Sequence, residues 1–133
     1  MTERQFTLAE AQALLEESVR PLAERIVALR AASRERELRW QRVVMAVGSN
    51  GGGLPMREVQ SLRERLERDR DDLRGLVREL VGLGVQVKDL ERGLIDFPSV
   101  VDGQPALLCW QVGEERIAYW HTPEDGFAGR QPL

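Results

Sequence analysis

The sequence predicts an α+β fold, in which a long antiparallel helical hairpin is followed by a small antiparallel β-sheet of three or four strands. Leucines recur at helical spacing through residues 1–84, and glycines separate short apolar segments through residues 85–133. Most of the aromatic side chains lie in the last quarter of the chain. We therefore expect a helical hairpin over residues 1–84 and, packed on it, a β unit with a C-terminal loop tail over residues 85–133.

Composition indicates one globular domain. Of the 133 residues, 42% are hydrophobic and 31% are charged, which is typical of folded proteins and not of disordered ones. The first residues lack the apolar segment of a signal peptide, and no apolar run is long enough to span a bilayer. Cys109 is the only cysteine, so no internal disulfide can form. We therefore expect a cytoplasmic protein without a membrane partner.

The distribution of charge argues against nucleic-acid binding. Residues 1–84 contain 15 basic and 14 acidic side chains, whereas residues 85–133 contain 4 basic and 8 acidic ones. The arginines of the helical part are interleaved with acidic residues, as on a solvated helix face stabilised by ion pairs. Neither part offers the continuous basic surface that follows a phosphate backbone.

The first helix is predicted over about residues 7–47. Thr7 and Glu10 have the spacing of a capping box. Apolar residues then recur on one face at Leu8, Leu15, Leu22 and Leu29. Pro21 interrupts this pattern and either kinks the helix near Glu17 or begins a separate helix. The kink is favoured, because the apolar phase continues through the proline.

A glycine-rich turn over residues 48–54 separates this helix from a second one over about residues 55–83. Pro55 suits the first turn of a helix. The apolar stripe of the second helix consists of Val59, Leu62, Leu66, Leu73, Leu76, Leu80 and Leu83.

One polar layer is predicted within the hairpin. Asp69 is the only polar residue in the register of the second stripe, and antiparallel folding about the turn places it opposite Ser33, with Arg36 one turn away. Such a layer most simply fixes the register of the two helices or meets solvent. A ligand site at this height is the alternative.

The lengths of the helices predict a homodimer. Helices of about forty and thirty residues would be about 60 and 45 Å long at 1.5 Å per residue. The β unit covers only part of this length. We therefore expect a second copy to complete a four-helix bundle through the helices.

Four segments of the β unit read as strands, namely residues 85–88, 94–97, 106–112 and 116–121. Pro98 is expected to end the second strand, and Asp102–Gly103 is a turn signal before the third. Gly113–Glu114 has the length of a two-residue type II′ hairpin.

That hairpin turn predicts the register of the last two strands. It places Trp110 opposite Ile117 and Leu108 opposite Tyr119. These four side chains would form an aromatic–aliphatic face that packs on the helices.

The β unit also concentrates side chains that carry chemistry. A candidate polar site consists of Asp89, Glu91, Asp96, His121, Asp125 and Arg130. His121, the only histidine, could ligate a metal, act as a general base, or be a packed residue bonded to a backbone carbonyl. One histidine among carboxylates suits Mn, Fe or Mg better than zinc, and no ligand pair has diagnostic spacing. We expect a structural role and assign no metal or cofactor, with a divalent metal as the alternative.

Arg130 follows a glycine in the predicted tail. It could bind an anionic ligand with both arms of the guanidinium. We favour instead an ion pair with Asp96 or Asp89, which would clamp the tail over the sheet.

Cys109 is not expected to be a nucleophile. In the predicted register it lies opposite Ala118, and the distance to His121 is roughly 10 Å at 3.3 Å per strand residue. A thiol at that distance has no base to activate it.

Several stretches of the chain resemble a known family: VKD at residues 87–89, GLIDFP at 93–98, LCW at 108–110, YWH at 119–121 and GFAGRQP at 126–132, with FTL and EA near the start. They are similar to the bacterial domain-of-unknown-function family 2203, and the similarity covers nearly the whole chain. The resemblance implies a small bacterial protein. It supplies no activity and no functional residues.

Taken together, the residues favour a non-catalytic homodimer whose β unit and tail form an interaction surface. The alternative is a small metal-binding protein or enzyme with the candidate polar site at its centre, and a third possibility is a coiled-coil scaffold that binds a partner helix. A catalytic site requires these side chains to converge around a pocket. A structural role requires them to pair with one another.

Overall fold

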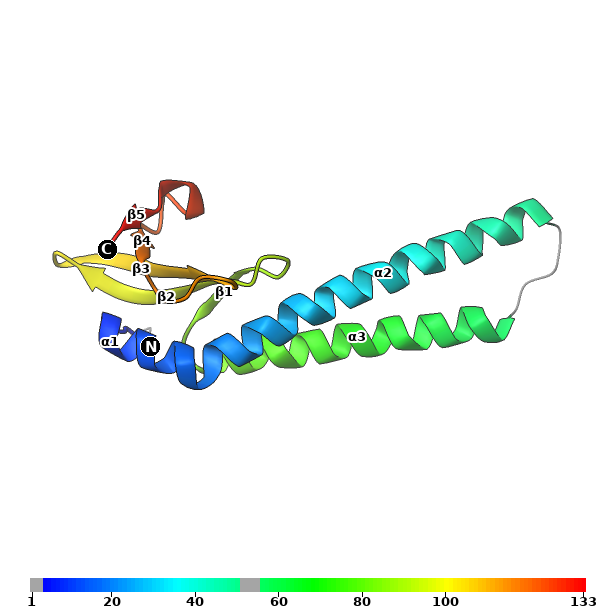
Figure 1. Ribbon diagram of the computed structural model, residues 1–133, viewed down its shortest axis with the longest axis horizontal. Helices are drawn as coiled ribbons and strands as arrows, with labels where there is room; N and C mark the ends of the chain where they lie inside the picture. Colours follow the sequence, from blue (N-terminus) through cyan, green and yellow to red (C-terminus); the bar gives the residue numbers. More distant parts are fainter. Residues whose placement is uncertain (1–3, 51–55) are drawn as a thin grey trace.

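The computed structural model describes residues 4–50 and 56–133 and confirms the α+β fold (Figure 1). A helical hairpin runs the length of the molecule, and an antiparallel sheet covers one end of it. We call the sheet with its tail, residues 85–133, the head. The part of the hairpin that the sheet does not cover, residues 35–50 and 56–70, projects from the head, and we call it the arm.

The helical elements are α1 (Leu8–Leu14), a π-helical turn η1 (Leu15–Val19), α2 (Arg20–Asn50), α3 (Met56–Gly82) and a short 3₁₀ turn η2 (Phe127–Gly129). The strands are β1 (Gln86–Asp89), β2 (Leu94–Val101), β3 (Gln104–Gln111), β4 (Tyr119–His121) and β5 (Gln131–Pro132). Five strands form the sheet in chain order, where three or four were predicted, because the tail adds β5 beside β4. The predicted glycines 51–53 and Pro55 lie outside the described residues. No helix within residues 4–50 and 56–133 combines the length and apolar character needed to cross a membrane.

The first helix begins and bends as predicted. The Thr7 hydroxyl accepts from the Glu10 amide at 3.1 Å, and the Glu10 carboxylate accepts from the Thr7 amide at 3.0 Å. Pro21 has no amide hydrogen to donate, and the turn before it is π-helical, with the Arg20 amide bonded to the Leu15 carbonyl. The chain changes direction there but stays helical from α1 through η1 into α2 (Figure 1), as a kinked helix does.

The core lies between the sheet and the near end of the hairpin. Its fully buried members include Leu15, Val19, Ile26 and Leu80 from the helices, and Ile95, Phe97, Leu108 and Trp110 from β2 and β3. Because side chains alternate along a strand, the residues between these four point to the other face of the sheet. Leu108 and Trp110 therefore face the helices, as predicted.

The polar layer of the hairpin joins Asp69 to Arg36. Asp69 is 7% exposed and accepts from Nε and Nη2 of Arg36, each at 2.7 Å. The partner lies three residues further along α2 than Ser33, which was predicted to face Asp69. The paired guanidinium and carboxylate offset the cost of burying either charge alone, and their fixed geometry favours one register of the hairpin.

β2 continues through Pro98, which was wrongly predicted to end it. The Pro98 carbonyl accepts from the Phe6 amide at 2.7 Å. The ring nitrogen points to the same side of the strand, away from β3, so no ladder hydrogen bond is lost. Asp102 and Gly103 form the predicted turn to β3, with φ of 51° and 77°, as a type I′ hairpin requires.

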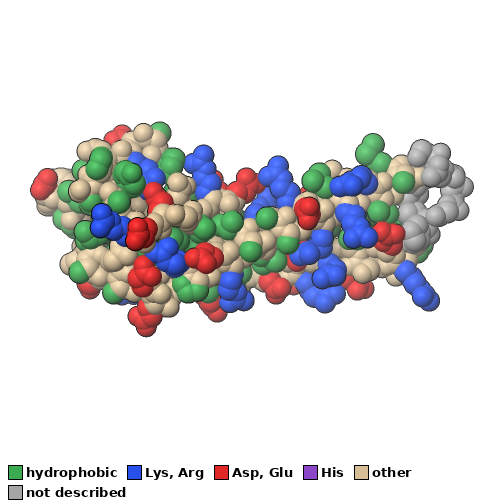
Figure 2. Space-filling view, viewed as in Figure 1, with side chains coloured by type: hydrophobic (Ala, Val, Ile, Leu, Met, Phe, Trp, Pro, Cys, Tyr) green, Lys and Arg blue, Asp and Glu red, His purple; other side chains and the backbone are tan. Residues whose placement is uncertain are grey.

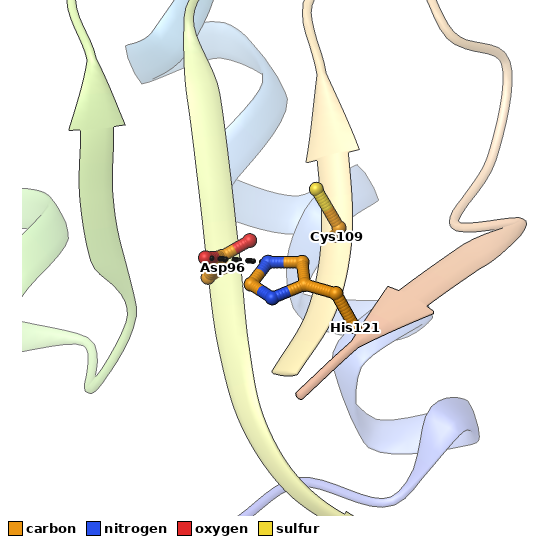
Figure 3. A group of neighbouring side chains, drawn as sticks. All are labelled: Asp96, Cys109 and His121. Carbon is orange, nitrogen blue, oxygen red and sulfur yellow. Dashed lines mark hydrogen bonds and ion pairs between the residues drawn. The ribbon is translucent and has the colours of Figure 1, made fainter. Parts of the chain in front are cut away.

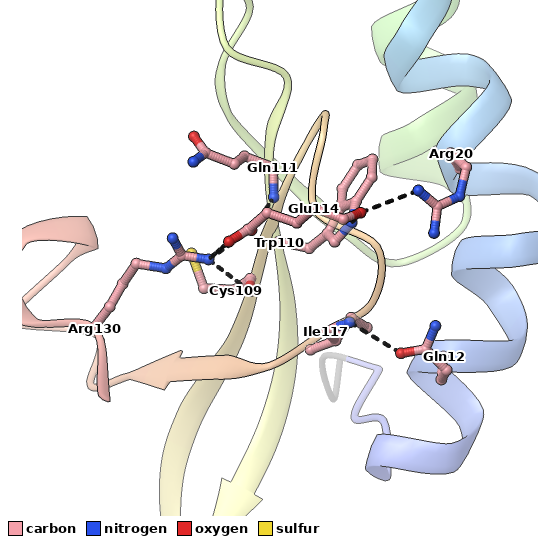
Figure 4. Close-up of polar contacts among 8 residues, drawn as sticks. All are labelled: Gln12, Arg20, Cys109, Trp110, Gln111, Glu114, Ile117 and Arg130. Carbon is pink, nitrogen blue, oxygen red and sulfur yellow. Dashed lines mark hydrogen bonds and ion pairs between the residues drawn. The ribbon is translucent and has the colours of Figure 1, made fainter. Parts of the chain in front are cut away.

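The connection between β3 and β4 is longer than predicted. Gly113, with φ of 103°, is the third residue of a β-turn that the Glu114 amide closes on the Gln111 carbonyl at 3.0 Å. The chain then runs to Tyr119 before it pairs again. Side chains of the helices hold this loop: Arg20 donates to the Glu114 carbonyl at 3.1 Å (Figure 4).

The longer connection changes the register of β4 by one residue. Cys109 pairs with Tyr119, and Leu108 pairs with Trp120, so the predicted pairing of Leu108 with Tyr119 is wrong. A shift of one residue exchanges the two faces of a strand. His121 therefore lies on the same face of the sheet as Cys109, away from the helices.

The Arg36–Asp69 pair leads to a test of the hairpin. We expect Asp69→Ala to lower the free energy of unfolding by about 2–3 kcal/mol, because a partly buried guanidinium loses its charge partner and two hydrogen bonds. Urea denaturation measures this change. Glu91→Ala is the control, since it breaks the exposed Arg34–Glu91 pair, and we expect it to cost less than about 1 kcal/mol. Equal losses would mean that Asp69 contributes no more than a surface charge.

Candidate functional site

Three side chains from three neighbouring strands meet on the face of the sheet that points away from the helices (Figure 3). They are Asp96 of β2, Cys109 of β3 and His121 of β4, and we call them the Asp–Cys–His cluster. One ligating atom of each lies within 4.8 Å of those of the other two. The three residues are 1%, 0% and 2% exposed.

Strand pairing brings the cluster together. Asp96 lies directly opposite Cys109 across β2 and β3. His121 lies opposite Leu107, two residues along β3 from Cys109 and therefore on the same face. The carboxylate, thiol and imidazole are thus held by backbone ladders and not by flexible loops.

The hydrogen bonds of His121 define where its protons lie. Nδ1 is 2.8 Å from the Thr122 carbonyl, which can only accept, so Nδ1 carries a hydrogen. Nε2 is 3.0 Å from Oδ2 of Asp96. Without a metal, one proton must lie between these two atoms, which gives either an imidazolium–carboxylate pair or an imidazole–carboxylic acid pair.

The cluster is not fully satisfied by its own hydrogen bonds. Oδ1 of Asp96 is buried and has no hydrogen-bond partner among the described residues. Buried polar atoms are nearly always bonded, and an exception calls for a ligand, an ion or a water. Burial, and then the charge of Asp96, raise the pKa of the Cys109 thiol to about 12. The thiol is therefore protonated at neutral pH and is a poor nucleophile by itself.

Of the six residues of the predicted polar site, the structure brings together only Asp96 and His121. Asp89 accepts from two backbone amides of the β1–β2 turn at 2.8 and 3.0 Å. Glu91 pairs with an arginine of α2 on the surface at 2.9 Å. Asp125 is exposed in the tail. None of these three converges with Asp96 and His121.

Arg130 clamps the tail over the sheet, but through a different partner from the aspartates that were predicted (Figure 4). One guanidinium nitrogen lies 2.6 and 2.8 Å from the two carboxylate oxygens of Glu114, and 3.3 Å from the Cys109 carbonyl. The guanidinium also stacks on the rings of Tyr119 and Phe127. Sequence reasoning missed Glu114, because it assigned this residue to a hairpin turn.

Cys109 is the member of the Asp–Cys–His cluster that the sequence analysis set aside. The predicted separation of roughly 10 Å from His121 is wrong, since the ligating atoms lie within 4.8 Å. The sequence does predict one contact of the cluster, because a two-residue turn at Asp102–Gly103 places Asp96 opposite Cys109. The position of His121 depends on the β3–β4 loop, and no local signal gives the length of that loop.

The raised pKa of Cys109 has a consequence for stability. The folded state keeps the thiol proton up to about pH 12, whereas the ordinary thiol titrates near 9.0. Stability from this group is therefore complete below pH 9 and decreases as the pH rises toward 12. In the presence of a chelator, we expect it to fall by about 1.4 kcal/mol between pH 8 and pH 10. Urea unfolding of the wild type and Cys109→Ala should show this difference in pH dependence, and identical slopes would contradict it.

Comparison with known proteins gives a family without a described activity. Residues 4–133 match the model of domain-of-unknown-function family 2203, which is described as an uncharacterized conserved protein. No curated protein matches the chain, and no solved structure does. The match covers essentially the whole chain, and the chain therefore belongs to domain-of-unknown-function family 2203.

Proposed function

We propose that this protein binds a divalent transition metal, preferably zinc, through the Asp–Cys–His cluster. The observation that supports this function best is the convergence of a carboxylate, a thiol and an imidazole, from three different strands, within 4.8 Å. These are the three side-chain types that bind zinc in proteins.

The surroundings of His121 support the same role. In histidines that bind a metal through one ring nitrogen, the N–H of the other usually donates to a carbonyl or a carboxylate, which fixes the tautomer. The Thr122 carbonyl takes this position at 2.8 Å from Nδ1 and leaves Nε2 directed at Asp96. A cation bound there would take the place of the shared proton and give the unbonded Oδ1 of Asp96 a partner.

The preference for zinc follows from Cys109. His121 with carboxylates alone would suit Mn, Fe or Mg, but a thiolate is a soft ligand that selects zinc over those metals. Zinc sites with three protein ligands complete their coordination with water or another group.

A structural role for the metal is favoured over catalysis. All three ligands are buried to 98% or more, so no exposed ligand faces a substrate. A bound ion would join β2, β3 and β4 and thereby stabilise a small head. This agrees with the non-catalytic function that the sequence favours. A cytoplasmic location, where a thiol stays reduced, suits Cys109 as a ligand.

The metal test begins with protein stripped by a chelator and loaded with zinc or cobalt. We expect one zinc per chain by elemental analysis and a thiolate-to-cobalt charge-transfer band in the ultraviolet spectrum. Asp96→Asn, Cys109→Ser and His121→Gln should each weaken zinc binding at least about tenfold, because each removes a ligand. Zinc should also raise the melting temperature of the wild type.

Asp102→Asn is the matched control for Asp96→Asn. It makes the same chemical change at an exposed aspartate whose positive φ an asparagine accepts. This variant should bind zinc as the wild type does. If the wild type binds no zinc, or binds it equally well after Cys109→Ser, the cluster holds only a proton and the proposed function is wrong.

A further inference from the structure

One segment of the chain crosses the face of the sheet on which the Asp–Cys–His cluster lies. It consists of residues 122–133, which leave β4 after His121 and include η2 and β5, and we call it the strap. Figure 1 shows the strap on the side of the sheet opposite the helices. In Figure 2, basic and apolar side chains cover this part of the head, and no histidine side chain is visible on the face drawn there. The strap therefore lies over the face that carries the cluster.

Four side chains from different parts of the head form a continuous stack on this face. The guanidinium carbon of Arg130 lies 4.2 Å from the centre of the Tyr119 ring and 4.8 Å from that of Phe127. The guanidinium carbon of Arg92 lies 5.0 Å from the centre of the Phe127 ring. Cations attract the faces of aromatic rings, and more strongly where water is excluded. The stack thus ties the strap to β4 on one side and to the β1–β2 turn on the other.

The stack lies beside the cluster. Tyr119 is the cross-strand partner of Cys109, so the two side chains lie on the same face of the sheet. Nη2 of Arg130 lies 3.3 Å from the Cys109 carbonyl and also binds the carboxylate of Glu114. Burial and the charge of Asp96 raise the pKa of the Cys109 thiol, and the positive charge of Arg130 opposes them, so the guanidinium is close to the thiol. The strap therefore covers the thiol side of the cluster.

The surroundings of the cluster are closed to a hydrated ion. Behind it, the opposite face of the sheet packs on the helices, and Ile95 and Trp110 are fully buried there. On the face of the cluster itself, Leu94 and Leu107 are 6% and 7% exposed. The three ligands are also buried. A cation can therefore reach them only when part of the head moves.

The strap is the part of the head with the fewest attachments to the core. Among the described residues, none of the strap belongs to the hydrophobic core. β5 pairs with β4 through two residue pairs. The strap is also held by the Arg130–Glu114 pair, by the stack and by a bond of 2.9 Å from the Leu133 amide to the Ala118 carbonyl. Segments with few buried apolar contacts open at a lower free-energy cost than global unfolding.

We propose that the strap is a gate over the metal site, which opens to let an ion reach or leave the cluster and closes over the bound ion. This inference rests on the proposed metal function. Opening requires Arg130 to leave Glu114 and the two aromatic rings, whereas β2 and β3 stay in place. The strap supplies no ligand, so its attachments control how fast the metal exchanges and not which metal binds.

Alkylation of Cys109 by iodoacetamide tests the gate in protein stripped of metal. Cys109 is the only cysteine, so mass spectrometry follows a single site. We expect slow labelling of the wild type, at a rate that does not change in low urea, because local opening exposes little surface. Arg130→Met and Phe127→Ala should each label at least about tenfold faster, because each removes attachments of the strap.

Arg116→Met is the matched control, because Arg116 is exposed in the β3–β4 loop, outside the strap. It should label as the wild type does. Circular dichroism checks that each variant is folded, and Phe127→Ala decides the outcome if Arg130→Met does not fold. A wild-type rate that rises steeply with urea would mean that only global unfolding exposes the thiol. That result, or strap variants that label no faster than the control, would overturn the gate.

Transfer of zinc to an excess of chelator tests the same gate with the metal in place. Both strap variants should release zinc faster than the wild type, by a factor similar to that seen in labelling, and Arg116→Met should release it at the wild-type rate. One common release rate would show that the strap does not control exchange and would overturn the gate. Failure to bind zinc at all contradicts the proposed function, and it is seen before any rate is measured, so the two failures are distinguishable.

Discussion

The register of the strands determines which side chains meet on the face of the sheet that points away from the helices. Asp102 and Gly103, both with positive φ, form a two-residue turn between β2 and β3. This turn places Asp96 opposite Cys109. The loop after β3 then determines which face His121 occupies. Arg20 and Gln12 hold that loop by hydrogen bonds to its backbone (Figure 4). A shift of one residue in the register of β4 would place His121 on the face toward the helices, away from Asp96 and Cys109.

Two of the buried polar arrangements among the described residues differ in kind. In the hairpin, Arg36 and Asp69 satisfy each other with two bonds of 2.7 Å, so the pair is complete and nothing further is required of it. In the head, His121 bonds to Asp96 and to a carbonyl, but one oxygen of Asp96 has no partner among the described residues. An incomplete buried network is costly unless something else completes it. This difference is the reason for proposing a ligand for the head and a structural role for the hairpin layer.

The parts of the fold that follow from local chemistry could be predicted. The capping box at Thr7, the bend at Pro21 and the Asp102–Gly103 turn each depend on a few neighbouring residues, and each is found as expected. The errors concern distances that several elements decide together. Pro98 stays in β2 because its ring nitrogen points away from β3, to the side where its carbonyl accepts from the amide of Phe6, at the start of the chain. Arg130 pairs with Glu114 because the β3–β4 loop folds back, and the same loop brings His121 beside Cys109.

The state of the His121 ring is the most direct test of the account. His121 is the only histidine, so isotopically labelled histidine gives one pair of ring-nitrogen signals in a nuclear magnetic resonance spectrum. We expect Nδ1 to keep its hydrogen throughout and Nε2 to lose its shared proton and shift to a metal-bound position when one equivalent of zinc is added. Ring signals that do not change with zinc, or a ring with its hydrogen on Nε2 and none on Nδ1, would contradict the assignment of this cluster as a metal site.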